Sequence, residues 1–347
     1  MKLLSSTFSW NYLKLKKIPY EKRRRSLIHY YLMNLNYKIL FLLPRKKYNS
    51  KIPITNKVFF KHDEGDWVLS KISGAVYEGI KQAGGVVDTS NKKPCDGYTF
   101  YEHYLPYSFD LARGLVKPNS GIIWFTHLRQ HSCSPQEIVH ALNKSALVVF
   151  QCQSDYDTLT ELGFCGKSAV LNGGVDPVWK TLQLKESAKC DFDLLISSRM
   201  YERKNPRAYR KLIESAPNLK FLFIGKGWDI FSEYSNVEVK DISYDEYPSY
   251  YARCKSLLSL SIVEGGPLCI LEALACGLPV IMSETGYYKE LSRSGLAYLD
   301  TNFHLRSEKE IKQIILSLQT NRDEREFTTT WTEFGRKFAS IINKCIN

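Results

Sequence analysis

The sequence predicts an α/β protein built from two Rossmann-like halves. Short apolar segments with the composition of strands alternate with segments of helical periodicity along most of the chain, a pattern typical of parallel sheets covered by helices. The 347 residues are enough for two domains of ordinary size. The alternation starts again after a glycine turn near residue 177, so we expect two sheets joined at that point.

The first half is expected to begin with a strand over Lys57–Lys61 and to end in the glycine turn. Apolar residues at helical spacing predict a helix over residues 68–82, and the glycine pair at 84–85 ends it. Composition and turn residues predict the other elements of this half, which are strands over 97–101, 121–126 and 146–150, helices over 135–143 and 155–162, and a strand within 168–179 that runs into the turn.

The second half repeats the alternation and ends in one more helix. Its expected strands cover residues 192–197, 219–224, 256–262 and 280–283, and its expected helices cover 205–215 and 246–254. The tail over 328–344 predicts an amphipathic helix, with an apolar side made of Trp331, Phe334, Phe338, Ile341 and Ile342.

Nearly all of the net positive charge lies in the first 50 residues. They hold twelve Lys or Arg against the single acidic residue Glu21, so they carry +11 of the formal charge of +12. Aromatic residues such as Phe8, Trp10 and Tyr12 are interleaved with these charges, a pattern that suits an anionic membrane surface or a nucleic-acid backbone. A solvated extension is the alternative. Because the rest of the chain is almost neutral, we do not expect nucleic acid as a partner.

Neither a membrane-spanning segment nor a secretory signal is apparent. The most apolar stretch of the arm, residues 26–43, is interrupted by polar residues, so it is expected to lie on a membrane rather than cross it. The nine cysteines are scattered and include no C-x-x-C pair, which indicates free thiols in a reducing compartment. We therefore expect a cytoplasmic protein that is peripheral on the inner face of the cell membrane through residues 1–50.

The stretch EGGPLCILEALACGLPV, residues 264–280, combines a glycine turn with two carboxylates eight positions apart. Pro267 predicts the start of a helix, and Gly277 predicts its end. The free amides at such a helix start suit a phosphate or diphosphate. Glu264 and Glu272 cannot bind an anion, so we expect them to accept hydrogen bonds from hydroxyls of a ribose or a sugar.

Two cations and one histidine are expected near this helix. Arg199 and Lys204 follow the first strand of the second half, where they complete an anion site that stabilises a departing diphosphate. Their neighbours Arg203 and Arg207 fit ordinary surface positions better. His127 ends a strand of the first half, at the carboxyl edge that faces the anion site.

These residues resemble the motifs of retaining glycosyltransferases of family 4, which have the GT-B fold. The resemblance rests on E-x7-E at Glu264 and Glu272, on R-x4-K at Arg199 and Lys204, on NGGVD at 172–176 and on the FIGKG turn at 223–227. It covers residues from about 57 to the C-terminus and is stronger in the second half.

The resemblance implies a nucleotide-sugar donor, such as a UDP- or GDP-hexose, bound between two domains. It implies Glu264 and His127 beside the donor sugar, Glu272 on the ribose, and Arg199 with Lys204 on the diphosphate. The donor side also includes Gly225, Gly265, Gly266, Pro267 and Leu268. Such enzymes transfer a hexose-like sugar with retention of configuration and need neither a metal nor another cofactor. We expect the acceptor to be a hydroxyl of a glycan, and the basic aromatic arm alone favours a lipid-linked glycan.

We expect four parts in the chain: the basic aromatic arm (1–55), a Rossmann-like acceptor domain (56–177), a Rossmann-like nucleotide-sugar domain (178–326) and a C-terminal helix (327–347), which the resemblance implies crosses back to the first domain. Acceptor contacts are expected in the first loop, HDEGDW, at Asp63, Glu64, Gly65 and Asp66. This loop has one glycine where the family usually has two. EGGP stands where E-G-F-G is commoner, so Pro267 removes one amide donor and leaves those of Gly266 and Leu268.

Two other interpretations compete with this one. Asp191 and Asp193 form a D-x-D string that a metal-dependent transferase would need, but they enter a strand at the edge opposite the expected site. The chain could instead be a non-catalytic membrane- or nucleic-acid-binding protein on a degenerate GT-B scaffold. Retention of both glutamates and both cations weighs against this second alternative.

Overall fold

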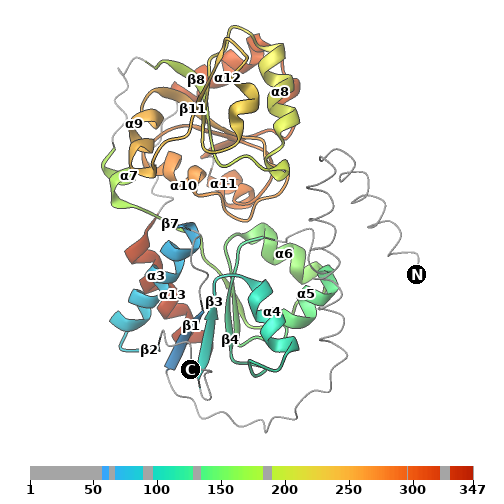
Figure 1. Ribbon diagram of the computed structural model, residues 1–347, viewed down its shortest axis with the longest axis vertical. Helices are drawn as coiled ribbons and strands as arrows, with labels where there is room; N and C mark the ends of the chain where they lie inside the picture. Colours follow the sequence, from blue (N-terminus) through green and yellow to red (C-terminus); the bar gives the residue numbers. More distant parts are fainter. Residues whose placement is uncertain are drawn as a thin grey trace, which may run out of the picture.

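Two six-stranded parallel sheets, each covered by helices on both faces, form the protein (Figure 1). The computed structural model describes residues 57–61, 67–88, 97–127, 134–182, 190–294, 296–320 and 329–346. The strand orders are β2-β1-β3-β4-β5-β6 in the first sheet and β10-β9-β8-β11-β12-β13 in the second. The prediction of two Rossmann-like halves is confirmed.

The first sheet is buried on both faces because apolar side chains alternate between two clusters. Phe100, Ile122 and Trp124 face one side, and Tyr101, Ile123 and Phe125 face the other. The elements of this half are β1 (Lys57–Lys61), α3 (Trp67–Gln82), β2 (Val86–Asp88), β3 (Tyr98–Tyr101), α4 (Tyr104–Ala112), β4 (Gly121–Phe125), α5 (Pro135–Leu142), β5 (Leu147–Phe150), α6 (Gln153–Glu161) and β6 (Ser168–Val170).

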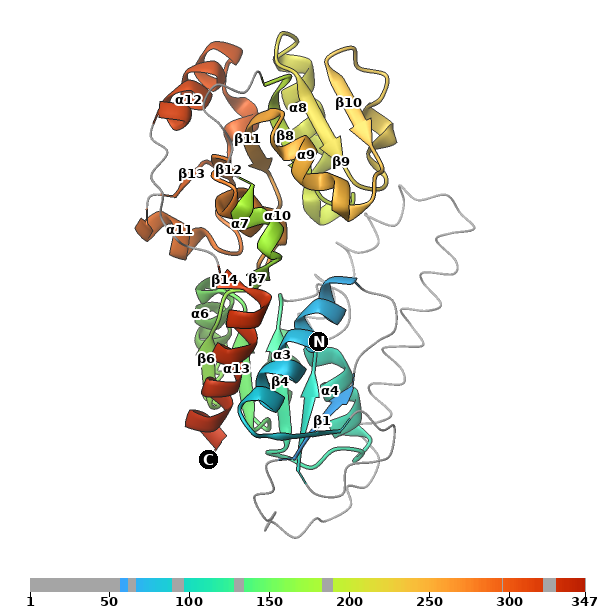
Figure 2. The ribbon, with the colours of Figure 1, turned by 90° about the vertical axis from the view of Figure 1, so that its left-hand side faces the viewer.

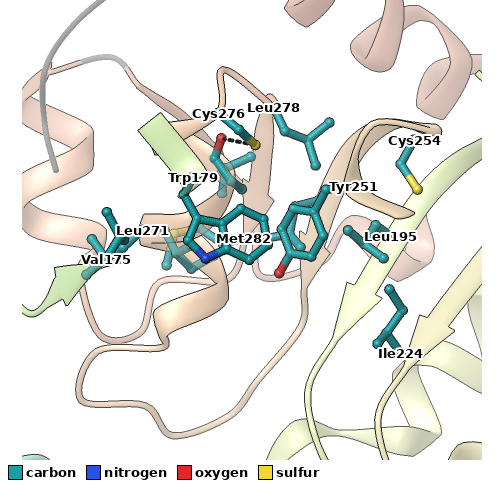
Figure 3. Packing of buried hydrophobic residues seen from close by; sticks show 14 of the residues in the cluster. Val175, Trp179, Leu195, Ile224, Tyr251, Cys254, Leu271, Cys276, Leu278 and Met282 are labelled. Atoms are coloured by element: carbon teal, nitrogen blue, oxygen red, sulfur yellow. Dashed lines mark hydrogen bonds between the residues drawn. The ribbon is translucent and has the colours of Figure 1, made fainter. Parts of the chain in front are cut away.

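The second sheet follows the same plan. One of its clusters packs Trp179 and Tyr251 against Leu271 and Met282, as Figure 3 shows. Its elements are β8 (Phe192–Ser197), η1 (Glu202–Lys204), α8 (Pro206–Ser215), β9 (Phe221–Ile224), η2 (Trp228–Phe231), β10 (Val237–Lys240), η3 (Tyr244–Glu246), α9 (Tyr247–Tyr251), β11 (Cys254–Ser259), α10 (Leu268–Ala275), β12 (Val280–Met282), α11 (Tyr288–Ser294), β13 (Ala297–Leu299), η4 (Phe303–Leu305) and α12 (Glu308–Thr320).

The chain passes between the halves twice, and the two crossings pair with each other. β7 (Gly174–Val175), which leads into α7 (Pro177–Thr181), lies parallel to β14 (Thr329–Thr330). The following helix α13 (Trp331–Ile346) runs beside α3 on the first half (Figure 2). The expected return of the last helix to the first half is therefore observed, and its apolar side joins the cluster on that face of the first sheet.

Some element boundaries differ from the predictions, most clearly around β11. The strand expected over 256–262 begins at Cys254 and ends at Ser259. It ends early because the next backbone amides bond outside the sheet: the N–H of Leu260 donates to the hydroxyl of Tyr209 (2.9 Å), and the N–H of Ile262 donates to the carbonyl of Arg203 (2.8 Å). This departure carries the chain toward Glu264.

The basic arm and the first loop lie outside the described residues. No helix within the ranges that the structure describes is long and apolar enough to cross a membrane.

Helices α3 and α13 approach so closely that their contact requires glycine on both sides. A Cβ at Gly79 would overlap the backbone of Gly335, and a Cβ at Gly335 would overlap the carbonyl of Ala75. By contrast, a Cβ at Gly74, an exposed position of α3, would meet open space. Two glycines of one helix therefore stand in opposite environments.

We expect Gly79→Ala to lower the free energy of unfolding by about 1–3 kcal/mol, because the added methyl group forces the two helices apart. The matched variant Gly74→Ala should raise it by up to about 1 kcal/mol, since alanine favours the helix. Urea denaturation of both variants measures the difference. Equal effects of the two substitutions would contradict the close packing of α3 on α13.

Candidate active site

The loop between β11 and α10 carries the first carboxylate of the predicted motif. Pro267 is the N-cap of α10, with extended backbone angles, so the helix begins one residue later than predicted. It ends at the expected place, where Gly277 has a φ of +77° and the N–H of Leu278 donates to the carbonyl of Ala273 (2.8 Å). Glu272 lies in the second turn of this helix, as expected.

Glu264 is buried between two cations. Its carboxylate pairs with Lys204 through one oxygen and with Arg203 through the other, the latter at 2.6 Å. Burial alone would raise the pKa of Glu264, but the charges of Lys204 and Arg203 outweigh it and lower the pKa to about 2. The carboxylate is therefore ionised at any physiological pH, which suits a hydrogen-bond acceptor and not a general acid.

The expectation that Arg203 is an ordinary surface residue is wrong. The short turn η1 directs two successive basic side chains, Arg203 and Lys204, onto the same carboxylate. Arg199 is exposed instead, and its guanidinium lies 5.6 Å from the ring centroid of Tyr201. Arg203 lies 5.7 Å from the same ring, so both arginines contact Tyr201.

Glu272 has the opposite electrostatic environment. It is 3% exposed and accepts hydrogen bonds from the hydroxyls of Tyr244 (2.6 Å) and Tyr251 (3.2 Å). Burial raises the pKa of Glu272 to about 7, although both tyrosines and the charge of Lys71 act to lower it. Near neutral pH this carboxyl group is divided between its protonated and ionised forms.

Cys269 links the two carboxylates in space. Burial raises the pKa of its thiol to about 12; Lys204 acts to lower that pKa, while Glu272 and Glu264 raise it further. The thiol of Cys269 is therefore under the electrostatic influence of both glutamates.

The glycine pair after Glu264 is one of the places where the two halves touch. A Cβ at Gly265 would overlap the carbonyl oxygen of Thr126, just after β4. The carbonyl of Gly266 accepts a hydrogen bond from the side-chain amide of Gln151 (2.7 Å), just after β5. From the sequence, only a ligand-binding role was expected for these glycines. The structure adds a second reason for them, the close approach of the first half.

His127 follows Thr126 directly and is half-buried. Because Thr126 contacts Gly265, the backbone of His127 lies close to the loop of Glu264. This agrees with the expectation that the strand before His127 ends at an edge facing that loop. Its role beside a donor sugar stays a prediction.

Gly225 and Leu268 complete the described part of the predicted donor side. Gly225 has a φ of +119°, and a Cβ there would meet the carbonyl of Ser198. This turn therefore lies against the backbone next to Arg199, at the carboxyl ends of β8 and β9. Leu268 opens α10.

Asp155, in the first turn of α6, is a residue that the sequence reasoning missed. Burial raises its pKa to about 7; the hydrogen bond from the Cys152 thiol (3.4 Å) lowers it, while the charges of Glu290 and Glu264 raise it. Asp155 lies just past the carboxyl end of β5, at the edge of the sheet where a ligand was expected. This position could have identified it from the sequence.

The remaining predicted positions are outside or away from this site. Asp63, Glu64, Gly65 and Asp66 lie outside the described residues. Asp191 and Asp193 pair with Arg253 (2.8 Å) and Lys255 (2.7 Å) where the chain enters β8, at the opposite edge of the sheet. Over the ranges described, no three or more His, Cys, Asp or Glu side chains are grouped so that they could hold a metal ion.

Comparison with known protein families gives a match in the second half of the chain. Residues 182–338 match the family described as "Glycosyl transferases group 1". No curated protein matches the sequence.

Comparison with solved structures identifies the fold of most of the chain. Anabaena Alr3699/HepE in complex with UDP-glucose is similar with a TM-score of 0.60 at 14% identity, over 83% of this chain and 99% of that one. Sucrose-phosphate synthase from Thermosynechococcus elongatus is similar with a TM-score of 0.51 at 15% identity, over 72% of this chain and 69% of that one. The expected fold class, GT-B, is confirmed.

We expect Gly265→Ala to separate the two halves, because its methyl group would take the space of the Thr126 carbonyl. The radius of gyration measured by X-ray scattering should increase while the circular dichroism spectrum stays unchanged. Gly173→Ala is the matched control, since a Cβ at that interdomain glycine meets its neighbours at an ordinary 3.4 Å. An unchanged radius for Gly265→Ala would show that the loop can yield without separating the halves.

Proposed function

We propose that the protein is a retaining glycosyltransferase of the hexosyltransferase type. It transfers a hexose-like sugar from a nucleotide-sugar, such as a UDP- or GDP-hexose, to a hydroxyl of a glycan or lipid-linked glycan in the synthesis of cell-surface polysaccharide. The observation that carries this proposal is the buried carboxylate of Glu264 held by Lys204 and Arg203 at the start of α10, with Glu272 on the same helix.

The charges of this cluster favour a diphosphate. Two cations meet one carboxylate, so one positive charge is left over beside the positive end of the α10 dipole. Arg199 is exposed nearby and can add a second. As the bond between sugar and diphosphate breaks, negative charge develops on the leaving group, and fixed cations stabilise it. We propose that transfer needs no metal ion.

The two glutamates would serve as acceptors for hydroxyl groups. Glu264 stays ionised because its pKa is about 2, so it can orient a hydroxyl of the donor sugar. Glu272 would hold the ribose, and His127 would contact the donor sugar from the other half. The bond between sugar and acceptor forms on the face from which the diphosphate leaves, which gives retention.

The comparisons support the nucleotide-sugar part of this proposal. The family match covers the half that contains both glutamates and all three cations. Alr3699/HepE, which has the same fold, was crystallised with UDP-glucose and with UDP. Neither comparison specifies the acceptor, which we assign from the basic aromatic arm alone.

Lys204→Ala and Glu272→Ala are each expected to lower the rate of sugar transfer by about 100-fold, because each removes a group that acts on the charged or ribose part of the donor. The assay combines a panel of UDP-, GDP- and ADP-sugars with glycan and lipid-linked acceptors, and proton NMR of the product reports the anomeric configuration. Lys309→Ala, on the exposed side of α12, serves as the control. Full rates in both site variants, or an inverted product, would contradict the assignment.

The arm over residues 1–50 is expected to attach the protein to the cytoplasmic face of the cell membrane, since it carries +11 of the net charge. The full chain should sediment with vesicles containing phosphatidylglycerol but not with vesicles of phosphatidylcholine alone. Binding should weaken in 0.5 M salt, because the Debye length falls to about 4 Å and the attraction between the arm and the membrane is screened beyond that distance. If a folded variant lacking residues 1–50 bound the anionic vesicles equally well, the arm would not be the anchor.

A further inference from the structure

The carboxylate proposed to hold the ribose is already occupied. The hydroxyl of Tyr244 donates to one oxygen of Glu272 at 2.6 Å, and that of Tyr251 donates to the other at 3.2 Å. The shorter bond is therefore the one from Tyr244. A ribose that binds Glu272 has to share these oxygens or replace a tyrosine.

The two tyrosines differ in how firmly they are held. Tyr251 is fully buried in α9, and its ring packs on Trp179 with centroids 4.7 Å apart (Figure 3). Tyr244 is only half-buried and belongs to η3, a turn of three residues. Tyr244 is thus the less deeply buried of the two tyrosines, and the one whose departure from Glu272 disturbs the core less.

Tyr244 is also held from the other half of the protein. The ammonium group of Lys71, on α3, lies 4.3 Å from the centroid of the Tyr244 ring. Lys71 forms an ion pair with Asp176, in the crossing between the halves. The indole N–H of Trp179 donates to the Tyr244 hydroxyl (2.9 Å). One side chain therefore connects the first half, the crossing and the carboxylate of α10.

We propose that Tyr244 is a clasp that the donor displaces. Its hydroxyl donates to Glu272 and its ring contacts Lys71 of the other half; a ribose that takes the carboxylate moves Tyr244 away and releases Lys71. This proposal rests on the proposed function, because it needs a ribose at Glu272. In this proposal Tyr244 is a positioning residue. It limits the affinity for the donor and couples that affinity to the contact between the halves.

If Tyr244 acts as this clasp, removing its hydroxyl should increase the affinity of the protein for a nucleotide. In Tyr244→Phe no phenol competes for Glu272, so the Kd of the bound nucleoside diphosphate should fall about tenfold, which is the size of the net contribution of one hydrogen bond. Inorganic pyrophosphate, which has no ribose, should bind the variant and the wild-type protein equally. Titration calorimetry with UDP, GDP, ADP and pyrophosphate measures both.

Two further variants distinguish the displacement of Tyr244 from a general disturbance of the site. Tyr247→Phe is the control. The Tyr247 ring lies 5.4 Å from that of Tyr244, but among the described residues the hydroxyls that donate to Glu272 are those of Tyr244 and Tyr251. This substitution should leave the Kd unchanged. Lys71→Met removes the hold from the other half and should tighten nucleotide binding two- to threefold, about 0.4–0.7 kcal/mol.

The outcomes distinguish this proposal from the function on which it rests. Nucleotide binding that is unchanged or weaker in Tyr244→Phe would overturn the clasp and leave the proposed function standing. An equal gain for nucleotide and pyrophosphate would also overturn it, since competition at the ribose cannot affect pyrophosphate. Weaker binding in Lys71→Met would overturn the connection to the other half. Wild-type protein that binds none of the three nucleotides would overturn the proposed function together with the clasp.

Discussion

The buried ion cluster of Glu264, Lys204 and Arg203 is the interaction around which the rest of the site is arranged. Glu264 has left the sheet at the end of β11, and the two cations come from the turn after β8. A carboxylate with so little exposure is stable only where cations compensate its lost hydration. The cluster therefore fixes the loop that leads into α10 and leaves a net positive charge where a diphosphate can bind.

The loop fixed by this cluster also joins the two halves. Gly265 and Gly266 allow Thr126 and Gln151 to approach the backbone beside Glu264. One short segment thus lies in the proposed anion site and also forms one of the contacts between the halves. Tyr244 with Lys71 provides another connection between the proposed donor site and the first half.

The fold could be predicted from the sequence because its central strands are apolar on both faces. The segments GIIWF, LVVF and FLFI form β4, β5 and β9, each buried along its whole length. The edge strands β2 and β13 were not predicted, because a strand of three residues carries too little pattern. Helix α4 was also missed, since its aromatic residues do not follow a simple amphipathic period.

The candidate site could be predicted only as far as local motifs reach. Glu264, Glu272 and Lys204 were found because helix caps and strand ends mark them along the chain. Arg203 was misjudged, because neighbouring residues usually point apart and only the turn η1 brings both to one carboxylate. The partner Tyr244 lies 28 positions from Glu272 in sequence, a separation that no periodicity reveals.

The most direct measurement is a crystal structure of the protein with bound UDP. The diphosphate should lie at the start of α10 beside Lys204 and Arg199, and the ribose hydroxyls should donate to Glu272 with the Tyr244 hydroxyl turned away. A nucleotide bound elsewhere, or one that leaves the carboxylates of α10 and its preceding loop untouched, would contradict this account of the site.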